Sequence, residues 1–330
     1  AIALFSLGVK VANSTFSLGD YQNYNGKVLS ETDKQELLDR IPVEGIDFNS
    51  TIEFRAMGVS FGRYAFRLKT LGVGFGQLPK DSIELILFGN NPGRVYQVND
   101  FNLKGQGVWS LSFSGAYPLE TGAFDEFSLG LTFRLVNGIR FLEVINAKGM
   151  LTTNDQGLKI EGDALVKQAK GGNGFSIDFG AAANFNAFLS AGVSLINLGS
   201  ITWDKEASEN RGKVGGDYLK VTDILDVKQF SDLFDPVSQE QRLTSFSRSL
   251  PTLLRLGFAW KTDRILLAVD WEKGLTKLSR PLFRSRISAG GEYKMRFWLP
   301  IRGGLSFGGR DKRMFTFGFG LGSHRILFDF

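Results

Sequence analysis

Residues 127–135 read Phe-Ser-Leu-Gly-Leu-Thr-Phe-Arg-Leu, with a large apolar side chain at every odd position and a small or polar one at every even position. Successive side chains of a β-strand point to opposite faces of the sheet, whereas an α-helix repeats about every 3.6 residues. The stretch therefore predicts a strand with one apolar face and one face of small and polar side chains.

The same alternation recurs along most of the chain, which contains 40 Gly and 30 Phe but only 8 Pro. Short turn signals, such as Asn137-Gly138 and Thr262-Asp263-Arg264, separate the alternating segments. The apolar positions change from odd to even at Gly322-Ser323, which indicates a bulge or a fifteenth segment. We predict about 14 strands, near residues 1–16, 46–61, 64–77, 101–118, 125–136, 139–153, 157–167, 173–185, 188–203, 252–262, 264–273, 283–294, 300–309 and 314–330.

Hydropathy excludes a bundle of membrane helices, because no stretch approaches the roughly 18 to 20 consecutive apolar residues that such a helix needs. Strands that are apolar on every second residue average to neutral, in line with the mean hydropathy of −0.05. The chain ends on Phe330, with Phe328 and Ile326 two and four positions earlier, as in a strand that closes an outer-membrane barrel. We predict a single domain over residues 1–330: an all-β, transmembrane, antiparallel β-barrel of about 14 strands in the bacterial outer membrane.

Three long connections are expected, near residues 18–45, 78–100 and 204–250. They follow the first, third and ninth predicted strands, so all three lie on the outer side of a barrel whose termini face the periplasm. The first contains Ser30 and Asp33, spaced as a capping box before a helix. The second predicts a helix over residues 80–88 that stops at Gly89.

The third connection predicts a helix near residues 222–234 with a mostly apolar face. An apolar helix face needs cover, so this helix is expected to fold over or into the barrel mouth. We predict that it contacts a ligand through Ile224, Leu225, Phe230 and Phe234.

Aromatic side chains with a polar edge fall near the predicted strand ends, where membrane proteins place them. Trp203 and Trp271 lie at outer ends, and the inner ends carry Tyr117, Trp260, Tyr293 and Trp298. The pattern predicts two aromatic belts, and simple packing at strand ends is the alternative.

If the apolar positions face lipid, a set of charged side chains faces the lumen. Its members are of both signs and lie on neighbouring strands, which predicts a lattice of salt bridges. The lattice either only fills and stabilises the barrel or lines a gap through which a solute passes. The predicted members are Arg134, Asp178, Arg255, Asp270, Glu272, Arg284, Arg286, Glu292 and Arg302.

Residue types argue against an enzyme. The chain contains no Cys and a single His, His324, which excludes thiolate metal sites and leaves no nucleophile motif beside the histidine. The net charge of +5 is spread along the chain and predicts no nucleic-acid partner. We expect no catalytic residues, no metal and no cofactor.

Four further segments carry a family resemblance. They are Gly172-Asn173-Gly174-Phe175-Ser176-Ile177-Asp178-Phe179-Gly180, Leu195-Ile196-Asn197-Leu198-Gly199-Ser200-Ile201-Thr202-Trp203, Ile287-Ser288-Ala289-Gly290-Gly291-Glu292-Tyr293 and Ile301-Arg302-Gly303-Gly304-Leu305. Their order, over about residues 45–330, resembles the FadL/PorV-like outer-membrane β-barrels, in particular an uncharacterised branch. The family has 14 strands and includes hydrocarbon transporters and a secretion-system shuttle.

The resemblance implies two functions of different classes. One is the binding or passive transport of hydrophobic small molecules, as in FadL, with a largely occluded lumen. The other is a non-transporting barrel that docks partner proteins in secretion or surface assembly, as in PorV. A FadL-type transporter carries an N-terminal plug, whereas this sequence begins almost at a strand. Either the plug is missing or loop helices occlude the lumen.

Overall fold

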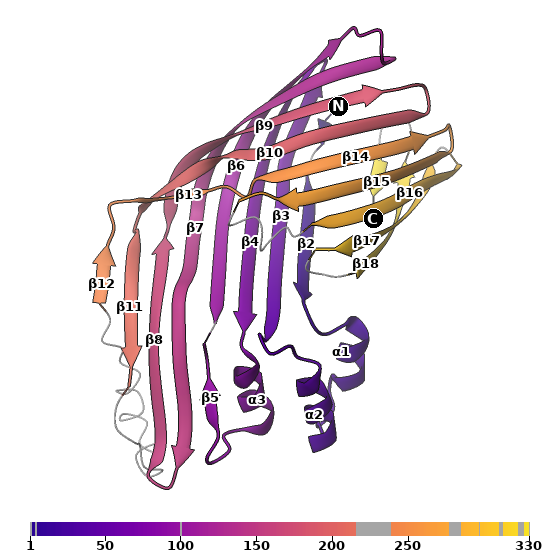
Figure 1. Ribbon diagram of the computed structural model, residues 1–330. Helices are drawn as coiled ribbons and strands as arrows, with labels where there is room; N and C mark the ends of the chain where they lie inside the picture. Colours follow the sequence, from indigo (N-terminus) through magenta and orange to yellow (C-terminus); the bar gives the residue numbers. More distant parts are fainter. Residues whose placement is uncertain are drawn as a thin grey trace.

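The structure is a computed structural model that describes residues 2–3, 5–99, 101–215, 239–276, 285–296, 298–309, 313–322 and 327–329. The fold is all-β, as the alternation predicts: an antiparallel sheet forms a strongly curved wall, and short helices lie at one end of it (Figure 1). Within these residues, no helix is both long enough and apolar enough to cross a membrane.

The helices are α1 (Leu18–Tyr24), α2 (Glu31–Asp39) and α3 (Lys80–Phe88). The strands of the first half of the chain are β1 (Ile2–Ala3), β2 (Ser6–Asn13), β3 (Ile46–Phe61), β4 (Tyr64–Leu78), β5 (Val95–Gln97), β6 (Asn102–Leu119), β7 (Glu126–Asn154) and β8 (Gly157–Ala169). Those of the second half are β9 (Gly171–Asn184), β10 (Leu189–Lys205), β11 (Ser208–Val214), β12 (Gln239–Arg242), β13 (Phe246–Ser249), β14 (Leu253–Lys261), β15 (Ile265–Gly274), β16 (Arg286–Arg296), β17 (Leu299–Gly308), β18 (Arg313–Gly322) and β19 (Leu327–Asp329).

Antiparallel pairing joins the main strands in one series: β2, β3, β4, β6, β7, β9, β10, β14, β15, β16, β17 and β18. β1 lies beside β3, and β19 pairs back onto the end of β18. The change of apolar phase at Gly322 thus marks the end of β18 and a separate last segment. In the described residues no ladder joins β2 to β18, so this part of the wall is open at that seam.

β7 is a single strand of 29 residues, where the sequence predicted two strands separated by a turn at Asn137-Gly138. Its first half pairs with β9 and its second half with β8. A Cβ on Gly138 would lie only 2.4 Å from Cζ3 of Trp203. The predicted turn is wrong because this glycine admits a neighbouring ring inside a strand.

The second half of β7 continues as a sheet extension, formed with β5, β8, β11 and β12 (Figure 1). Opposite charges pair across it: Arg211 Nη2 lies 2.7 Å from Asp163 Oδ2, and Lys167 Nζ lies 2.9 Å from Glu209 Oε2. The hydrogen bonds from Arg211 lower the pKa of the Asp163 carboxyl. The interval 204–250 was predicted as a loop, but its described part contains β11, β12 and β13. The prediction failed because charged and polar residues, rather than large apolar ones, dominate these strands.

The helices lie at the end of the wall where the long connections were predicted (Figure 1). α2 begins with the expected capping box of Ser30 and Asp33, whose hydrogen bonds lower the pKa of the Asp33 carboxyl. α3 spans the predicted residues and ends at Gly89. α1 was not predicted, although Ser17 and Asp20 form the same kind of box and carried the signal.

The apolar sides of α2 and α3 are covered within the fold. Leu38 and Ile41 pack with Ile83 of α3 and with Ile46 at the start of β3, and all four side chains are buried. This small core closes the ends of β3 and β4. The described helices therefore use their apolar faces for packing, with Ile86 of α3 left 73% exposed.

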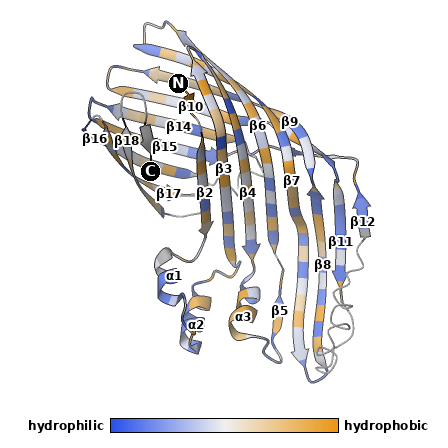
Figure 2. Ribbon diagram, turned by 180° about the vertical axis from the view of Figure 1, so that it is seen from behind, coloured by the Kyte–Doolittle hydropathy of each residue, from blue (hydrophilic) through white to orange (hydrophobic). Residues whose placement is uncertain are grey.

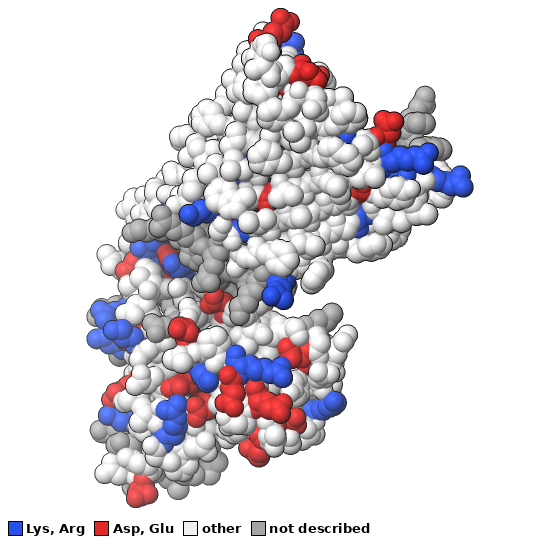
Figure 3. Space-filling view, turned by 45° about the vertical axis from the view of Figure 1, so that its right-hand side comes forward, with Lys and Arg blue, Asp and Glu red and all other residues white. Residues whose placement is uncertain are grey.

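The outward face of the wall is apolar. On β7, Leu129, Leu131 and Phe133 are 43–51% exposed, and on β18 Phe315 and Phe317 are 79% and 77% exposed. Hydrophobic and hydrophilic positions alternate along the strands in Figure 2. In Figure 3 the upper wall is largely uncharged, whereas charged side chains crowd the part with the helices and the extension. A large exposed apolar surface of this kind favours contact with lipid.

Aromatic side chains follow the belt prediction at one end only. Tyr117, Trp260, Tyr293 and Trp298 are 39–61% exposed at the end of the wall away from the helices. Trp203 is instead fully buried, so its assignment to the other belt is wrong and the packing alternative holds. Trp203 faces inward because β10 contains a bulge.

Candidate ligand site on the inner face of the wall

The inner face is the face of the wall opposite to the outward apolar side chains, and it has two different regions. The first, on β7, β9 and β10, we call the filled region. At its centre is Trp203, fully buried, with its ring centroid 5.3 Å from that of Phe141. Ile201 is equally buried. The residues of β9 paired with these two are Gly172 and Gly174, where a Cβ would lie 2.5 Å from Thr202 O and 2.2 Å from Ser200 O, so these glycines let the backbone of β10 approach closely.

A polar cluster lies next to this apolar centre. Arg134 donates from Nη2 to Asp178 Oδ2 at 2.5 Å and from Nε to Ser112 Oγ at 3.2 Å. Its Nη1 donates to Asn197 Oδ1 and, at 3.4 Å, to Ser176 Oγ. The Asn197 backbone N–H donates to the second carboxylate oxygen of Asp178 at 2.7 Å. Arg134 and Asp178, both predicted as lattice members, are therefore paired and hydrogen-bonded within the wall.

Asn197 occupies a bulge in β10. Its φ is 62°, a left-handed conformation that Asn tolerates better than most residues. Leu195 pairs with Phe179 and Leu198 with Ile177, so β10 advances three residues while β9 advances two. The extra residue changes which side chains of β10 face inward, and this is why Ile201 and Trp203 point into the filled region.

The second region, on β14 to β18, we call the hollow region. Cross-strand pairing places its inward side chains in rows that run across the strands. The middle rows consist mostly of short side chains, and an open pocket of about 470 Å³ lies over them. The rows, in order along the strands, are Leu266–Glu292–Arg302–Gly318, Ala268–Gly290–Gly304–Thr316, Asp270–Ser288–Ser306–Met314 and Arg255–Glu272–Arg286.

The charges that border the pocket are mostly paired with one another. Glu272 accepts from Arg286 at 2.8 Å and from Arg255 at 3.2 Å. Glu292 and Arg302 form a pair at 2.7 Å. Asp270 differs: it is exposed to the pocket, and within the described part of the chain no side chain forms a hydrogen bond or ion pair with it.

The predicted lattice is thus partly assembled. Its described members other than Asp270 form the separate pairs given above, and Arg284 lies outside the described residues. So do all four predicted ligand contacts of the third connection, Ile224, Leu225, Phe230 and Phe234, whose role stays a prediction.

Two acidic centres were missed by the sequence reasoning. Glu53 lies 2.6 Å from both Arg55 and Lys69. Glu143 lies 2.8 Å from Arg248 and 3.1 Å from Lys104. The signal that could have found most of them is the same alternation, since Glu53, Arg55, Lys69, Lys104 and Glu143 lie on β3, β4, β6 and β7, whereas Arg248 lies on β13, within a predicted loop.

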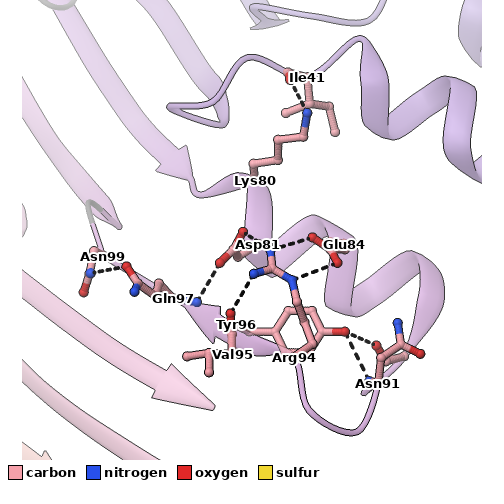
Figure 4. A network of polar contacts seen from close by, with 11 residues as sticks. Ile41, Lys80, Asp81, Glu84, Asn91, Arg94, Val95, Tyr96, Gln97 and Asn99 are labelled. Atoms are coloured by element: carbon pink, nitrogen blue, oxygen red, sulfur yellow. Dashed lines mark hydrogen bonds and ion pairs between the residues drawn. The ribbon is translucent and has the colours of Figure 1, made fainter. Parts of the chain in front are cut away.

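A further polar network holds α3 against the extension (Figure 4). Arg94 donates to Glu84 of α3 at 3.0 Å and to Asp81 at 3.0 Å, and the hydrogen bond with Glu84 raises the pKa of the guanidinium. The second oxygen of Asp81 accepts from the backbone N–H of Gln97 in β5 at 2.8 Å. Tyr96, fully buried, donates its hydroxyl to Gly89 O at 3.1 Å. These contacts fix the helix end of the wall.

Metal chemistry has no candidate in the described part of the chain, where no group of three His, Cys, Asp or Glu residues is arranged to hold an ion. The two regions instead define a class of protein: an all-β wall with an apolar outward face and, on its inner face, one packed region and one open pocket bordered by ion pairs.

Residues 1–328 match the family of unknown function DUF5723, and the chain belongs to this family. The comparison with curated proteins found no match. Among solved structures, the toluene transporter TodX of Pseudomonas putida is 12% identical, with a TM-score of 0.45 and an alignment that covers 98% of this chain and 79% of that one. The deltaS2 mutant of TodX, a monoaromatic hydrocarbon channel, is 10% identical, with a TM-score of 0.33 and coverage of 80% and 77%.

Proposed function

We propose that this chain is an outer-membrane β-barrel that binds or passively transports hydrophobic small molecules, with a lumen that is largely occluded. The observation that carries the proposal is the pocket of the hollow region, an open space of about 470 Å³ on the inner face of a wall whose outward face is apolar. Pockets for small organic molecules have volumes of about 300–1,000 Å³.

The lining of the pocket suits a molecule with little charge. Of its bordering charges, Arg286 and Glu292 are engaged in the ion pairs with Glu272 and Arg302, so no ring of one sign is presented to an ion. Ala268, the neighbouring glycines, and the apolar side chains of Leu266 and Met314 form most of the remaining surface. Outside the row of Asp270, Ser288 and Ser306, the lining offers few partners to a polar solute, whereas an apolar solute loses little there.

The membrane assignment rests on the outward face. Exposed Leu, Phe and Ile side chains on neighbouring strands would form a contiguous apolar surface in water far beyond that of ordinary soluble proteins. In a bilayer the same surface faces hydrocarbon, and the exposed Tyr and Trp side chains at one end lie where a headgroup belt would be.

The docking alternative has less support from the inner face. A barrel that only binds partner proteins needs no pocket in its wall, and filling the space under β14 to β18 as tightly as the region around Trp203 would stabilise it more. The sheet extension remains a surface that a partner could contact, but Arg211 and Asp163, like Lys167 and Glu209, are engaged with one another there.

The test fills the pocket without changing the outward face. Ala268→Phe places a ring in the pocket, and Val269→Phe, at the next residue of the same strand, places the same ring on the outward face. Uptake of radiolabelled toluene would be measured in Gram-negative cells that express either variant as a heat-modifiable barrel. We expect Ala268→Phe to lower uptake toward that of cells without the protein and Val269→Phe to retain it. Equal uptake by both variants would remove the pocket from the transport path.

A further inference from the structure

The pocket of the hollow region contains one carboxylate, that of Asp270, that takes part in none of the described ion pairs. Asp270 lies in the third row. It pairs with Gly257 on β14, which has no side chain beyond a hydrogen atom, and with Ser288 on β16. Its Oδ1 is so close to Gly257 that a Cβ there would lie 2.5 Å from it. The glycine therefore gives the carboxylate room to lie over the wall.

We propose that this pocket binds a small organic cation, a protonated primary amine on an apolar body, with Asp270 as its counterion. The inference rests on the proposed function in that it names the class of hydrophobic small molecule that the same pocket prefers.

The row that contains Asp270 provides hydrogen-bond acceptors for an ammonium group. Ser288 pairs directly with Asp270 across β15 and β16, and Ser306 pairs with Ser288 across β16 and β17. Side chains at such paired positions have Cβ atoms about 4.5–5.5 Å apart. The carboxylate of Asp270 and the hydroxyl of Ser288 can therefore both accept hydrogen bonds from one primary ammonium group, whose third N–H bond remains for water.

The ends of the pocket suit the rest of such a molecule. Leu266 and Met314 contribute apolar surface on either side of the small rows. Arg302 and Glu292 at one border are mutually paired, and at the other border Glu272 engages both Arg286, which lines the pocket, and Arg255, which does not. Asp270 is the carboxylate of the lining that no described arginine engages, so an amine beside it is favoured over a carboxylate of the same shape.

A metal ion is a poorer occupant for the same residues. Calcium takes about 6–8 oxygen ligands and magnesium about six, usually with more than one carboxylate. The pocket offers a single carboxylate, and the bordering Glu272 and Glu292 are engaged by arginines. An organic ammonium group needs only one charge and a few acceptors.

The experiment compares three probes of the same shape: benzylamine, benzyl alcohol and benzoate. Binding to the protein in lipid nanodiscs at pH 7 would be measured by calorimetry, with empty nanodiscs as the reference for partitioning. We expect benzylamine to bind about fivefold more tightly than benzyl alcohol, the value of a partly exposed ion pair, and benzoate to bind most weakly. Asp270→Asn should reduce the preference for the amine to about one, whereas Asp263→Asn, the same change in the exposed turn between β14 and β15, should retain it.

The outcomes separate this inference from the proposed function. Benzyl alcohol that binds wild type and is lost in Ala268→Phe, with no preference for benzylamine, would overturn the inference and leave the proposed function standing. A preference that Asp270→Asn does not change would also overturn it. If neither probe binds above the empty nanodisc, both proposals fail. The wild-type comparison with benzoate decides the sign of the pocket without any variant.

Discussion

Both the filled and the hollow region of the inner face contain glycines. The two regions differ in the residue that lies across from each glycine on the neighbouring strand. In the filled region, Gly138 lies against Trp203, and the space it leaves is taken by the ring, whereas Gly172 lets the backbone of Thr202 and Trp203 approach closely. In the hollow region, Gly290 pairs with Gly304, and the nearest atom to a Cβ on Gly290 is a backbone oxygen at 3.5 Å. Glycine therefore does not by itself make a cavity in a sheet. The cross-strand neighbour decides whether the space is packed or open.

The largest effect should come from emptying the filled region. Trp203→Ala removes a fully buried ring and leaves a cavity, so we expect a loss of about 3–5 kcal/mol in the free energy of unfolding. Urea titration in lipid vesicles, followed by far-UV circular dichroism, measures it. A cost below that of an ordinary surface substitution would mean that the region around Trp203 is not packed, and the contrast between the two regions would disappear.

A charge on the outward face should cost somewhat less. Leu131→Arg, on an exposed position of β7, should lower stability by about 2–4 kcal/mol near the bilayer midplane, whereas Thr132→Ser on the inner face should cost little. Thr132 shares a hydrogen bond of 2.8 Å with Ser114, which a serine can keep. The same unfolding titration applies. Equal costs at both positions would reverse or abolish the assignment of faces on which the comparison depends.

Matched glycine substitutions test the comparison directly. Gly138→Ala forces a methyl group against the Trp203 ring, and overpacking of this kind costs about 1–3 kcal/mol. Gly290→Ala places the same methyl group in the open pocket and should change stability by no more than about 0.5 kcal/mol. Similar losses for the two variants, measured side by side, would show that the pocket is closed in the membrane.

The smallest signal should be ionic current. The packed region fills part of the inner face, and most charges that border the pocket are paired, so the occluded lumen that we propose should show little or no steady conductance in planar bilayers. Neutralising Arg255 or Arg302 with glutamine should raise the leak by leaving Glu272 or Glu292 less compensated. A large, stable ohmic conductance in wild type would indicate an open diffusion pore and contradict the occluded lumen.

Local patterns predicted the parts of this fold that depend on neighbours in sequence. The strict alternation placed β3 at its observed bounds, and the capping box and terminal glycine placed α2 and α3. Failures occurred where a distant residue decides. Asn137-Gly138 has the sequence pattern of a turn, and only the contact of Gly138 with Trp203 explains why it lies within a strand. The extension lacks the apolar alternation that predicted the other strands.

The candidate site was predicted less completely. Alternation predicted the inward charges of β14 to β17 because it assigns the face of each residue, and Arg255, Glu272 and Arg286 form one row. It could not distinguish Asp270 from its paired neighbours, since pairing depends on strand register and on the glycine opposite. Nor could it show that small residues of four strands meet in the same rows and leave a pocket.

The bulge at Asn197 sets which face of the wall each later residue of β10 occupies. The orientation of that half of the strand therefore depends on the number of residues before it rather than on their identity. Deleting Asn197 would keep the order of the later residues of β10, but Ile201 and Trp203 would then face outward while Ser200 and Thr202 would face inward. A survey of substitutions would rate this asparagine as one hydrogen-bonding residue among several. A survey of single-residue deletions should find it to be among the least tolerant positions of the wall, because there an edit shifts the phase of everything that follows up to the next break in the ladder.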